Sequence, residues 1–272
     1  MTKSNIPATL TEILGTADKP DLDVLVDYIT DSGEGRVALD NDVCARLSAA
    51  KVAPAYEPGD VALIEQELRQ FGGNSVANLV RSMRGGIGAL FGGAGAAESV
   101  SYDEIVRDVA EHLKVKFGKY AGTPEVEEGI LSSLLVASFE KMSPEEREQV
   151  LEDLGVSDAA EVAKRGAAAI SAGIAAAAIS SAVGFQLSRM VAAASVKALL
   201  GRGLVLGTTS FVARPVMVLA GPIGWAVTGA WALADMASPA YRVTVPCVVQ
   251  VAYMRRKAAQ GRLLLDTPAM SA

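Results

Sequence analysis

The chain has 272 residues, of which 50% are hydrophobic and only 5% aromatic, and it carries a formal net charge of -6. Its apolar mass therefore lies in alanine, valine, leucine and isoleucine, a composition that favours closely packed helices over a sheet sandwich. Charged residues make up 21% of the chain, which excludes a simple multi-span membrane protein.

Charge divides the chain into two unlike parts. From residue 166 onward there are nine basic and two acidic residues, a net charge of +7, whereas residues 1–165 carry −13. This asymmetry predicts two helical domains, an acidic one over residues 1–160 and an apolar, basic one over residues 161–272. The opposite charges also allow the basic part to dock on the acidic part.

The cysteines and the first residues favour a reducing compartment. Cys44 and Cys247 lie far apart and neither belongs to a CxxC pair, so free thiols in a cytoplasmic protein are expected. Residues 1–20 lack the apolar run and small-residue cleavage site of a secretory signal peptide.

Two helical regions are predicted before residue 84. The first ends at the turn residues 31–33 and places four apolar residues on one face: Leu22, Leu25, Val26 and Ile29. The second has apolar residues at helical spacing over 61–71. Gly72 and Gly73 predict that it ends there in a left-handed cap, with a short second helix reaching Met83 to complete a helical hairpin.

More short helices follow a glycine-rich interruption at 85–97. Ser101 is predicted to start one helix, and Thr123-Pro124 another. Ser143 and Glu146, on either side of a proline, have the spacing of a capping box. Carboxylates near the starts of these helices are interpreted as solvated groups that complement the helix dipole: Glu125, Glu127, Glu128, Glu145, Glu146 and Glu148.

The basic part contains a predicted hydrophobic hairpin over about 166–234. Residues 166–188 and 215–234 are uncharged stretches of 23 and 20 residues, and about 20 are needed to cross a bilayer as a helix. Its candidate membrane-facing residues are Ile170, Ile174, Ile179, Phe185, Leu219, Trp225 and Trp231. The basic residues expected to face lipid or a protein partner are Arg189, Arg202, Arg214, Arg255, Arg256 and Lys257.

The sequence is compatible with three arrangements of this hairpin: a permanent membrane span, a buried core hairpin, or a hairpin that inserts into a membrane only when it is released. The apolar side chains of the first stretch favour insertion by roughly 2–3 kcal/mol, which its glycines and serines largely offset. Positive charges lie both in the intervening loop and on the two flanks, which would be on opposite sides of a membrane. Neither orientation of a two-span protein then keeps all of them in the cytoplasm. Basic residues near the stretches favour anionic lipid.

Signals for chemistry are weak. His112 is the single histidine and is interpreted as a surface residue, with Asp108 one turn before it. The motifs of serine hydrolases, P-loop proteins, zinc proteases and EF-hands do not occur, so no enzyme, cofactor or metal is predicted. The YMRRK run at 253–257 has too few charges and aromatics to indicate nucleic-acid binding.

Two segments carry a family resemblance. ELRQFGGNSVANLVR (67–81) and AYRVTVPCVVQVAYMRR (240–256) resemble the signature segments of the YaaW-like family of uncharacterised bacterial proteins. The signature residues are Phe71, Gly72, Gly73, Asn74, Asn78, Tyr241, Arg242 and Pro246. The resemblance implies an all-α fold and a bacterial cytoplasmic or inner-membrane setting, and it supplies no reaction.

The expected function is therefore conditional membrane association, pore-forming or toxin-like, through release of a buried hydrophobic hairpin. The expected partners are anionic membrane lipid, another protein, or a second copy of the chain. Parts of the sequence also resemble the ubiquinol–cytochrome c assembly chaperones, which motivates an alternative: a soluble helical chaperone or interaction module whose hairpin stays buried.

Overall fold

A computed structural model of the chain describes residues 9–36, 39–83, 100–153, 159–164, 181–199 and 241–266. All regular secondary structure within these ranges is helical, which confirms the predicted all-α class. The helices are α1 (Leu10–Gly15), α2 (Lys19–Thr30), α3 (Asn41–Val52), α4 (Pro58–Met83), α5 (Tyr102–His112), α6 (Thr123–Lys141), α7 (Pro144–Asp153), α8 (Ala159–Lys164), α10 (Ser181–Leu199) and α13 (Tyr241–Asp266).

Local capping signals account for several helix ends. The Ser101 side chain accepts a hydrogen bond from the backbone N–H of Glu104, whose carboxylate accepts one from Ser101 in return, so α5 starts with the expected cap. At α7 the Glu146 N–H donates to Ser143 Oγ at 3.2 Å and the Ser143 N–H donates to Glu146 Oε2 at 2.8 Å. Helix α2 ends at Thr30, and its C-cap residue Asp31 has a φ of 57°, which confirms the predicted turn.

The expected hairpin at Gly72 is wrong, because α4 runs without a break from Pro58 to Met83. Gly72 is not in the left-handed region; it lies where α4 meets α5. A Cβ placed on Gly72 would be 2.3 Å from Cγ1 and Cδ1 of Ile105. The glycine therefore permits a close approach of two helices rather than ending one.

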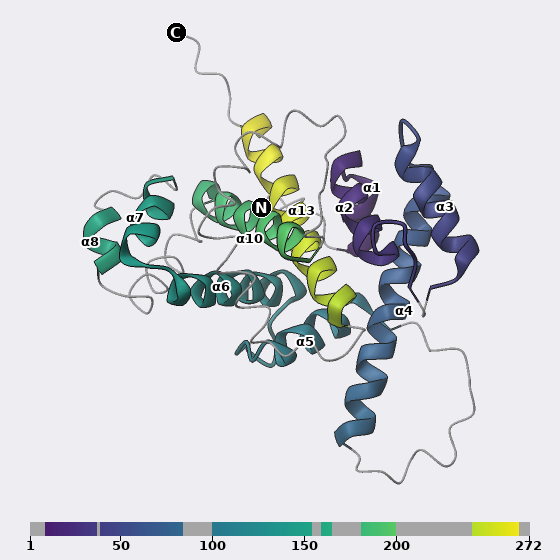
Figure 1. The fold of residues 1–272 in the computed structure, drawn as a ribbon, viewed down its shortest axis with the longest axis horizontal. Coiled ribbons are helices and arrows are strands. Elements are labelled where there is room, and N and C mark those ends of the chain that lie inside the picture. Colours follow the sequence, from purple (N-terminus) through teal and green to yellow (C-terminus); the bar gives the residue numbers. More distant parts are fainter. Residues whose placement is uncertain are drawn as a thin grey trace.

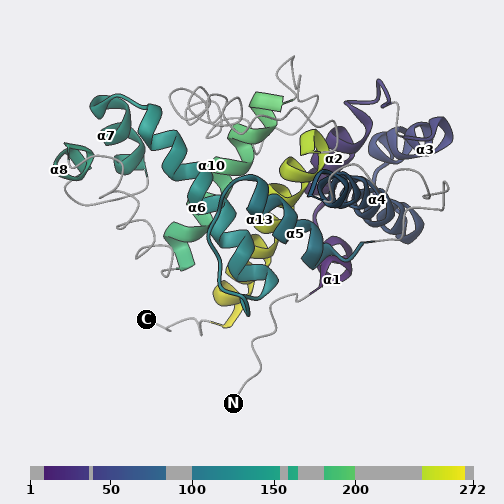
Figure 2. The ribbon, with the colours of Figure 1, turned by 90° about the horizontal axis from the view of Figure 1, so that it is seen from below.

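Helix α13 occupies the centre of the molecule (Figures 1 and 2), with α10 and α6 on one side and α2 and α4 on the other. It also contacts α1 and α5. Every residue from Val243 to Ala252 is buried. A helix surrounded in this way is expected to carry apolar residues on every face, which explains its many valines, and its few buried polar side chains, such as Gln250, need partners inside the protein.

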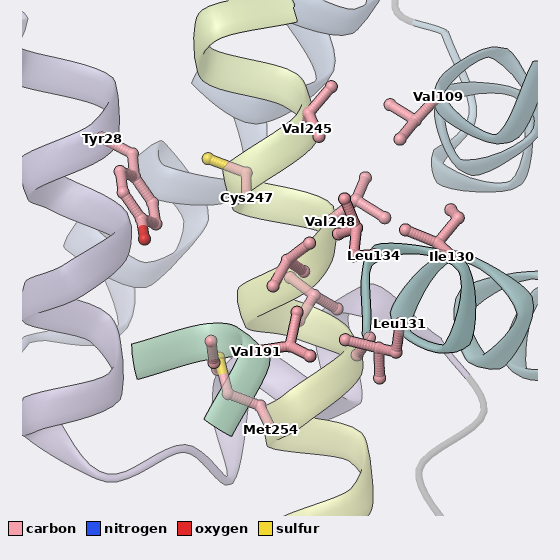
Figure 3. Close-up of a cluster of buried hydrophobic side chains, with 14 of the residues drawn as sticks. Tyr28, Val109, Ile130, Leu131, Leu134, Val191, Val245, Cys247, Val248 and Met254 are labelled. Atoms are coloured by element: carbon pink, nitrogen blue, oxygen red, sulfur yellow. The ribbon is translucent and has the colours of Figure 1, made fainter. Parts of the chain in front are cut away.

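The core around α13 draws side chains from helices on opposite sides of it (Figure 3). Tyr28 of α2 lies toward the side of α13 that carries Cys247, while Val248 faces Ile130 and Leu134 of α6. Met254 and Val191 of α10 extend this cluster along the helix. Residues from both predicted domains thus contribute to one core, and a boundary at residue 160 stays a prediction.

Pro246 is the sixth residue of α13, which starts at Tyr241. Proline lacks an N–H, so the carbonyl of Arg242 loses its usual helical donor. Arg242 is exposed, which allows water to serve that carbonyl instead.

No helix in the described ranges is long and apolar enough to cross a membrane. The hairpin predicted over about 166–234 lies largely outside those ranges; α10 is its described part.

Candidate functional site

Three consecutive basic residues of α13, Arg255, Arg256 and Lys257, form ion pairs with the acidic part of the chain. We call them the Arg255–Lys257 run. These cations pair with four carboxylates of the acidic half, two in α6 and two at the start of α2. Arg256 forms an ion pair with Glu128, whose side chain is 44% exposed. The basic part of the chain therefore does dock on the acidic part through these residues.

Arg255 and Glu127 form an ion pair inside the protein. Arg255 Nε lies 2.6 Å from Glu127 Oε2, and Nη2 lies 3.1 Å from Oε1, a two-pronged contact. Their side chains are only 5% and 2% exposed. The Tyr102 hydroxyl donates a third hydrogen bond to Glu127 Oε1 at 2.9 Å. Burial raises the pKa of Glu127, and the hydrogen bonds from Arg255 and Tyr102 oppose that rise.

Lys257 joins α13 to the start of α2. Its Nζ lies 2.7 Å from Asp18 Oδ2 and 2.7 Å from Asp21 Oδ2. Gln250 supports the same junction, because its Nε2 donates to the backbone carbonyl of Asp21 at 3.4 Å. Burial raises the pKa of Asp21, and the hydrogen bond from Lys257 opposes this. The two Lys257 partners differ in exposure: the Asp18 side chain is 67% exposed and that of Asp21 only 11%.

The other end of α13 rests on the Asp108 cluster, defined as Asp108, His112 and Tyr241. The Tyr241 hydroxyl donates to Asp108 Oδ1 at 3.1 Å, and the rings of His112 and Tyr241 stack 3.8 Å apart. Asp108 Oδ2 is buried with no hydrogen-bond partner in the described part of the chain. Burial raises the pKa of Asp108 to about 6, the Tyr241 hydrogen bond opposes the rise, and the charge of Glu111 adds to it.

This raised pKa makes stability depend on pH. Folding disfavours the Asp108 anion, so its contribution to stability is complete below pH 4 and is lost as the pH rises through about 6. Between pH 4 and pH 8, the free energy of unfolding of Asp108→Asn should increase by about 2 kcal/mol relative to that of the wild type. This is less than the shift in pKa alone implies, because solvent screens part of the effect. Urea denaturation across this pH range measures it.

The control for that experiment is Glu125→Gln, which removes an exposed carboxylate from the first turn of α6. We expect its stability difference from the wild type to change by less than about 0.5 kcal/mol over the same range. Parallel pH profiles for Asp108→Asn and the wild type would contradict the assignment of a buried anion.

A third group of side chains lies between α10 and α13. The Arg189 cluster, as we define it, contains Phe185 and Arg189 of α10 with Tyr253 and Lys257 of α13. The rings of Phe185 and Tyr253 stack with centroids 5.9 Å apart. Burial raises the pKa of Tyr253, the carboxylate of Asp21 adds to this, and the charges of Lys257 and Arg189 oppose it.

The structure places the remaining predicted residues as follows. Phe71, Gly72 and Gly73 are buried in α4, and Asn74 and Asn78 belong to the same helix. Six hairpin residues and two arginines lie outside the described ranges: Ile170, Ile174, Ile179, Leu219, Trp225, Trp231, Arg202 and Arg214.

Sequence reasoning missed the most important carboxylate. Glu127 was expected to be solvated, which is wrong, because it is 2% exposed and pairs with Arg255. A signal for its burial exists in the sequence: Glu127 is three, four and seven residues before inward-facing apolar residues, namely Ile130, Leu131 and Leu134. An acidic residue in phase with such a face predicts a buried partner of opposite charge.

The described histidine, cysteine and carboxylate side chains do not form any group of three that could hold a metal ion. Cys44 and Cys247 are both buried as free thiols. Burial raises the pKa of the Cys247 thiol to about 12, so it stays protonated and unreactive at neutral pH.

Fold and site together define a class: an all-α protein whose central helix is held at both ends by buried polar contacts. Relatives of known sequence give the family. The chain is 34% identical over 198 residues to a UPF0174 protein of Helicobacter pylori, covering 73% of this chain and 72% of that protein. A second UPF0174 protein of the same organism is 36% identical, with 87% of its length covered.

The UPF0174 protein YaaW of Escherichia coli is 32% identical over 196 residues, which cover 71% of this chain and 70% of that protein. The chain therefore belongs to the UPF0174 family, and the predicted YaaW-like resemblance is confirmed. No family model matches the chain, and neither does any solved structure.

Proposed function

We propose that this UPF0174 protein associates conditionally with anionic membranes through the apolar segment 215–234, the second uncharged stretch of the hairpin predicted over about 166–234. The observation that carries the proposal is an uncharged stretch, residues 215–234, that joins two helices fixed in the protein core, α10 and α13. A stretch of this length and composition requires cover from water, by protein or by lipid. The fixed helices on either side keep it attached to the folded body in both cases.

In this role the protein lies in the cytoplasm, at the inner membrane, with anionic lipid as its partner. Insertion of the uncharged stretch 215–234 is energetically marginal, because a proline and three glycines interrupt it, and a marginal free energy suits reversible rather than permanent association. A pore-forming activity requires in addition that several copies assemble, since one such hairpin encloses no channel.

Native tryptophan fluorescence tests the proposal directly. The chain contains two tryptophans, Trp225 and Trp231, and both lie in the apolar segment. The full-length protein is mixed with vesicles of phosphatidylcholine alone or with phosphatidylglycerol, each in a normal and a bromine-labelled form. We expect bromine-labelled anionic vesicles to quench the emission by at least about half, and neutral vesicles to leave it unchanged, because basic flanks favour anionic surfaces.

Dye release from the same vesicles separates surface association from pore formation. Quenching without release supports association alone, whereas release that rises steeply with protein concentration supports an assembled pore. Emission that stays insensitive to every vesicle contradicts the proposal.

That last outcome would favour the second candidate, a helical chaperone or interaction module with the hairpin permanently buried. One observation supports this alternative: the Arg255–Lys257 run is already neutralised by carboxylates. It leaves fewer free cations for a lipid surface.

A further inference from the structure

The connection between α5 and α6 carries positive charge that the fold does not neutralise. The lysine loop, by which we mean residues 113–122, contains three lysines and no carboxylate. Lys114, Lys116 and Lys119 are all exposed, and none of them forms an ion pair within the described ranges. By contrast, each of the helices α2, α3, α4 and α5 has a cation that pairs with a carboxylate. The lysine loop therefore offers free positive charge to a partner.

Apolar contacts hold the lysine loop against the protein. Val115 and Phe117 are partly buried and pack against the core, so they alternate with the exposed Lys114 and Lys116. Arg107 of α5 supports the loop from below, because its Cζ lies 5.6 Å from the centre of the Phe117 ring. A loop fixed in this way loses little conformational entropy when its lysines contact a partner.

Lys114 occupies a backbone position that favours glycine. Its φ is 58°, and the Val115 N–H donates to the carbonyl of Ala110 at 2.8 Å, as in the usual left-handed end of a helix. This conformation costs energy for any residue that has a Cβ. A lysine at such an exposed position suits a role of its ammonium group outside the folded core.

Tyr120 adds an aromatic ring to the same surface. Tyr120 is 91% exposed, and Lys119 Nζ lies 5.7 Å from the centre of its ring. Lysines are attracted to anionic headgroups, and tyrosine rings favour the boundary between headgroups and hydrocarbon. Proteins that bind single-stranded nucleic acid use several stacking rings and arginines, whereas the lysine loop has one exposed ring and no arginine. The composition of the loop therefore favours lipid over nucleic acid.

The lysine loop begins beside the start of α13. The ring of His112, the residue before the loop, stacks on that of Tyr241 with centroids 3.8 Å apart. Residue 234, the last of the uncharged stretch 215–234, precedes Tyr241 by seven residues, a reach of at most about 25 Å of extended chain. One bilayer surface can therefore contact the loop and receive the apolar segment.

We propose that the lysine loop binds the surface of an anionic membrane, with Lys114, Lys116 and Lys119 at the headgroups and Tyr120 in the interfacial layer. The choice of lipid as ligand rests on the proposed function, but contact through the loop does not require the apolar segment to insert. The loop provides an electrostatic first contact that brings residues 215–234 to the bilayer.

Flotation of the full-length protein with vesicles of phosphatidylcholine and phosphatidylglycerol, at several lipid concentrations, tests the loop. A lysine at an anionic surface changes the affinity by about fivefold, so Lys116→Gln should weaken binding by that factor. The triple variant Lys114→Gln/Lys116→Gln/Lys119→Gln should weaken it by about a hundredfold. Tyr120→Ser should weaken it by about threefold, through loss of the interfacial ring.

The matched control is Lys164→Gln, which removes an exposed lysine from α8 that likewise forms no ion pair within the described ranges. We expect it to change binding by less than about twofold, because screening limits the effect of a charge away from the contact. Equal losses for Lys116→Gln and Lys164→Gln would overturn the loop, since general attraction of charges would then explain the binding. Lys114→Gly separates binding from folding: its melting temperature should be equal to that of the wild type or higher, while its affinity falls about fivefold.

The same vesicles distinguish failure of the loop from failure of the proposed function. Vesicle binding that is unaffected by every loop variant would overturn the loop and leave the proposed function standing. Binding that depends on the loop, without quenching of Trp225 and Trp231 by bromine-labelled lipid, would keep the loop and overturn insertion of 215–234. A wild-type protein that binds no vesicle would overturn both, and binding of an oligouridylate that is lost in the triple variant would then assign the loop to nucleic acid instead.

Discussion

The variant Glu127→Gln should lower the free energy of unfolding by about 3–5 kcal/mol, because it removes the carboxylate that forms a two-pronged ion pair with the buried Arg255 guanidinium. Both side chains are almost fully enclosed, at 5% and 2% exposure, so water cannot replace the lost charge. Since a domain is typically stable by about 5–15 kcal/mol, such a loss is a large part of the total. Urea denaturation at pH 7, followed by circular dichroism, measures it.

Two further variants identify the cause. Glu128→Gln removes the neighbouring carboxylate, whose partner Arg256 is more exposed, and should cost about 1 kcal/mol or less. The double variant Glu127→Leu/Arg255→Met replaces the buried pair by apolar side chains and should recover most of the loss. A Glu127→Gln cost no greater than that of Glu128→Gln would contradict the buried pair.

The variant Gly72→Ala should also destabilise the fold, by about 1–2 kcal/mol. The added methyl would lie 2.3 Å from Cγ1 and Cδ1 of Ile105, so α4 and α5 must move apart or Ile105 must change its rotamer. Alanine favours a helix over glycine by up to about 1 kcal/mol, which offsets part of the cost. Thermal and urea denaturation of both proteins measure the difference.

Gly261→Ala is the matched control, because Gly261 is an exposed helical residue and a methyl added to it would meet no atom within 4 Å. It should stabilise the protein by about 0.5–1 kcal/mol through helix propensity alone. Adding Ile105→Val to Gly72→Ala should recover part of the loss, since it removes Cδ1. A stabilising Gly72→Ala would show that α4 and α5 are not in close contact.

Local signals predicted the parts of this fold that depend on neighbouring residues. The caps at Ser101 and Ser143 and the turn at Asp31 are correct, because each rests on a hydrogen bond or backbone angle set within a few residues. The inward face of α2 is also correct, since helical periodicity alone selects it.

Features that depend on distant residues were not predicted. Two glycines in succession are typical of a helix end, and only the presence of α5 shows that Gly72 allows a close approach instead. Glu127 meets a partner 128 positions away, a pairing that no local pattern specifies. The central position of α13 likewise arises from the faces that six other helices present to it.

That central position has a consequence for how the chain matures during translation. Helices α1 to α6 are synthesised before α13, and at roughly 5–20 residues per second α13 follows α6 after about 10 seconds. During this interval the side chains that pack on α13 in the folded protein lack that helix, and both uncharged stretches are synthesised in the same period. The nascent protein therefore exposes its most apolar surfaces at the same time. At this stage it can bind a chaperone, aggregate with other nascent chains or contact a bilayer.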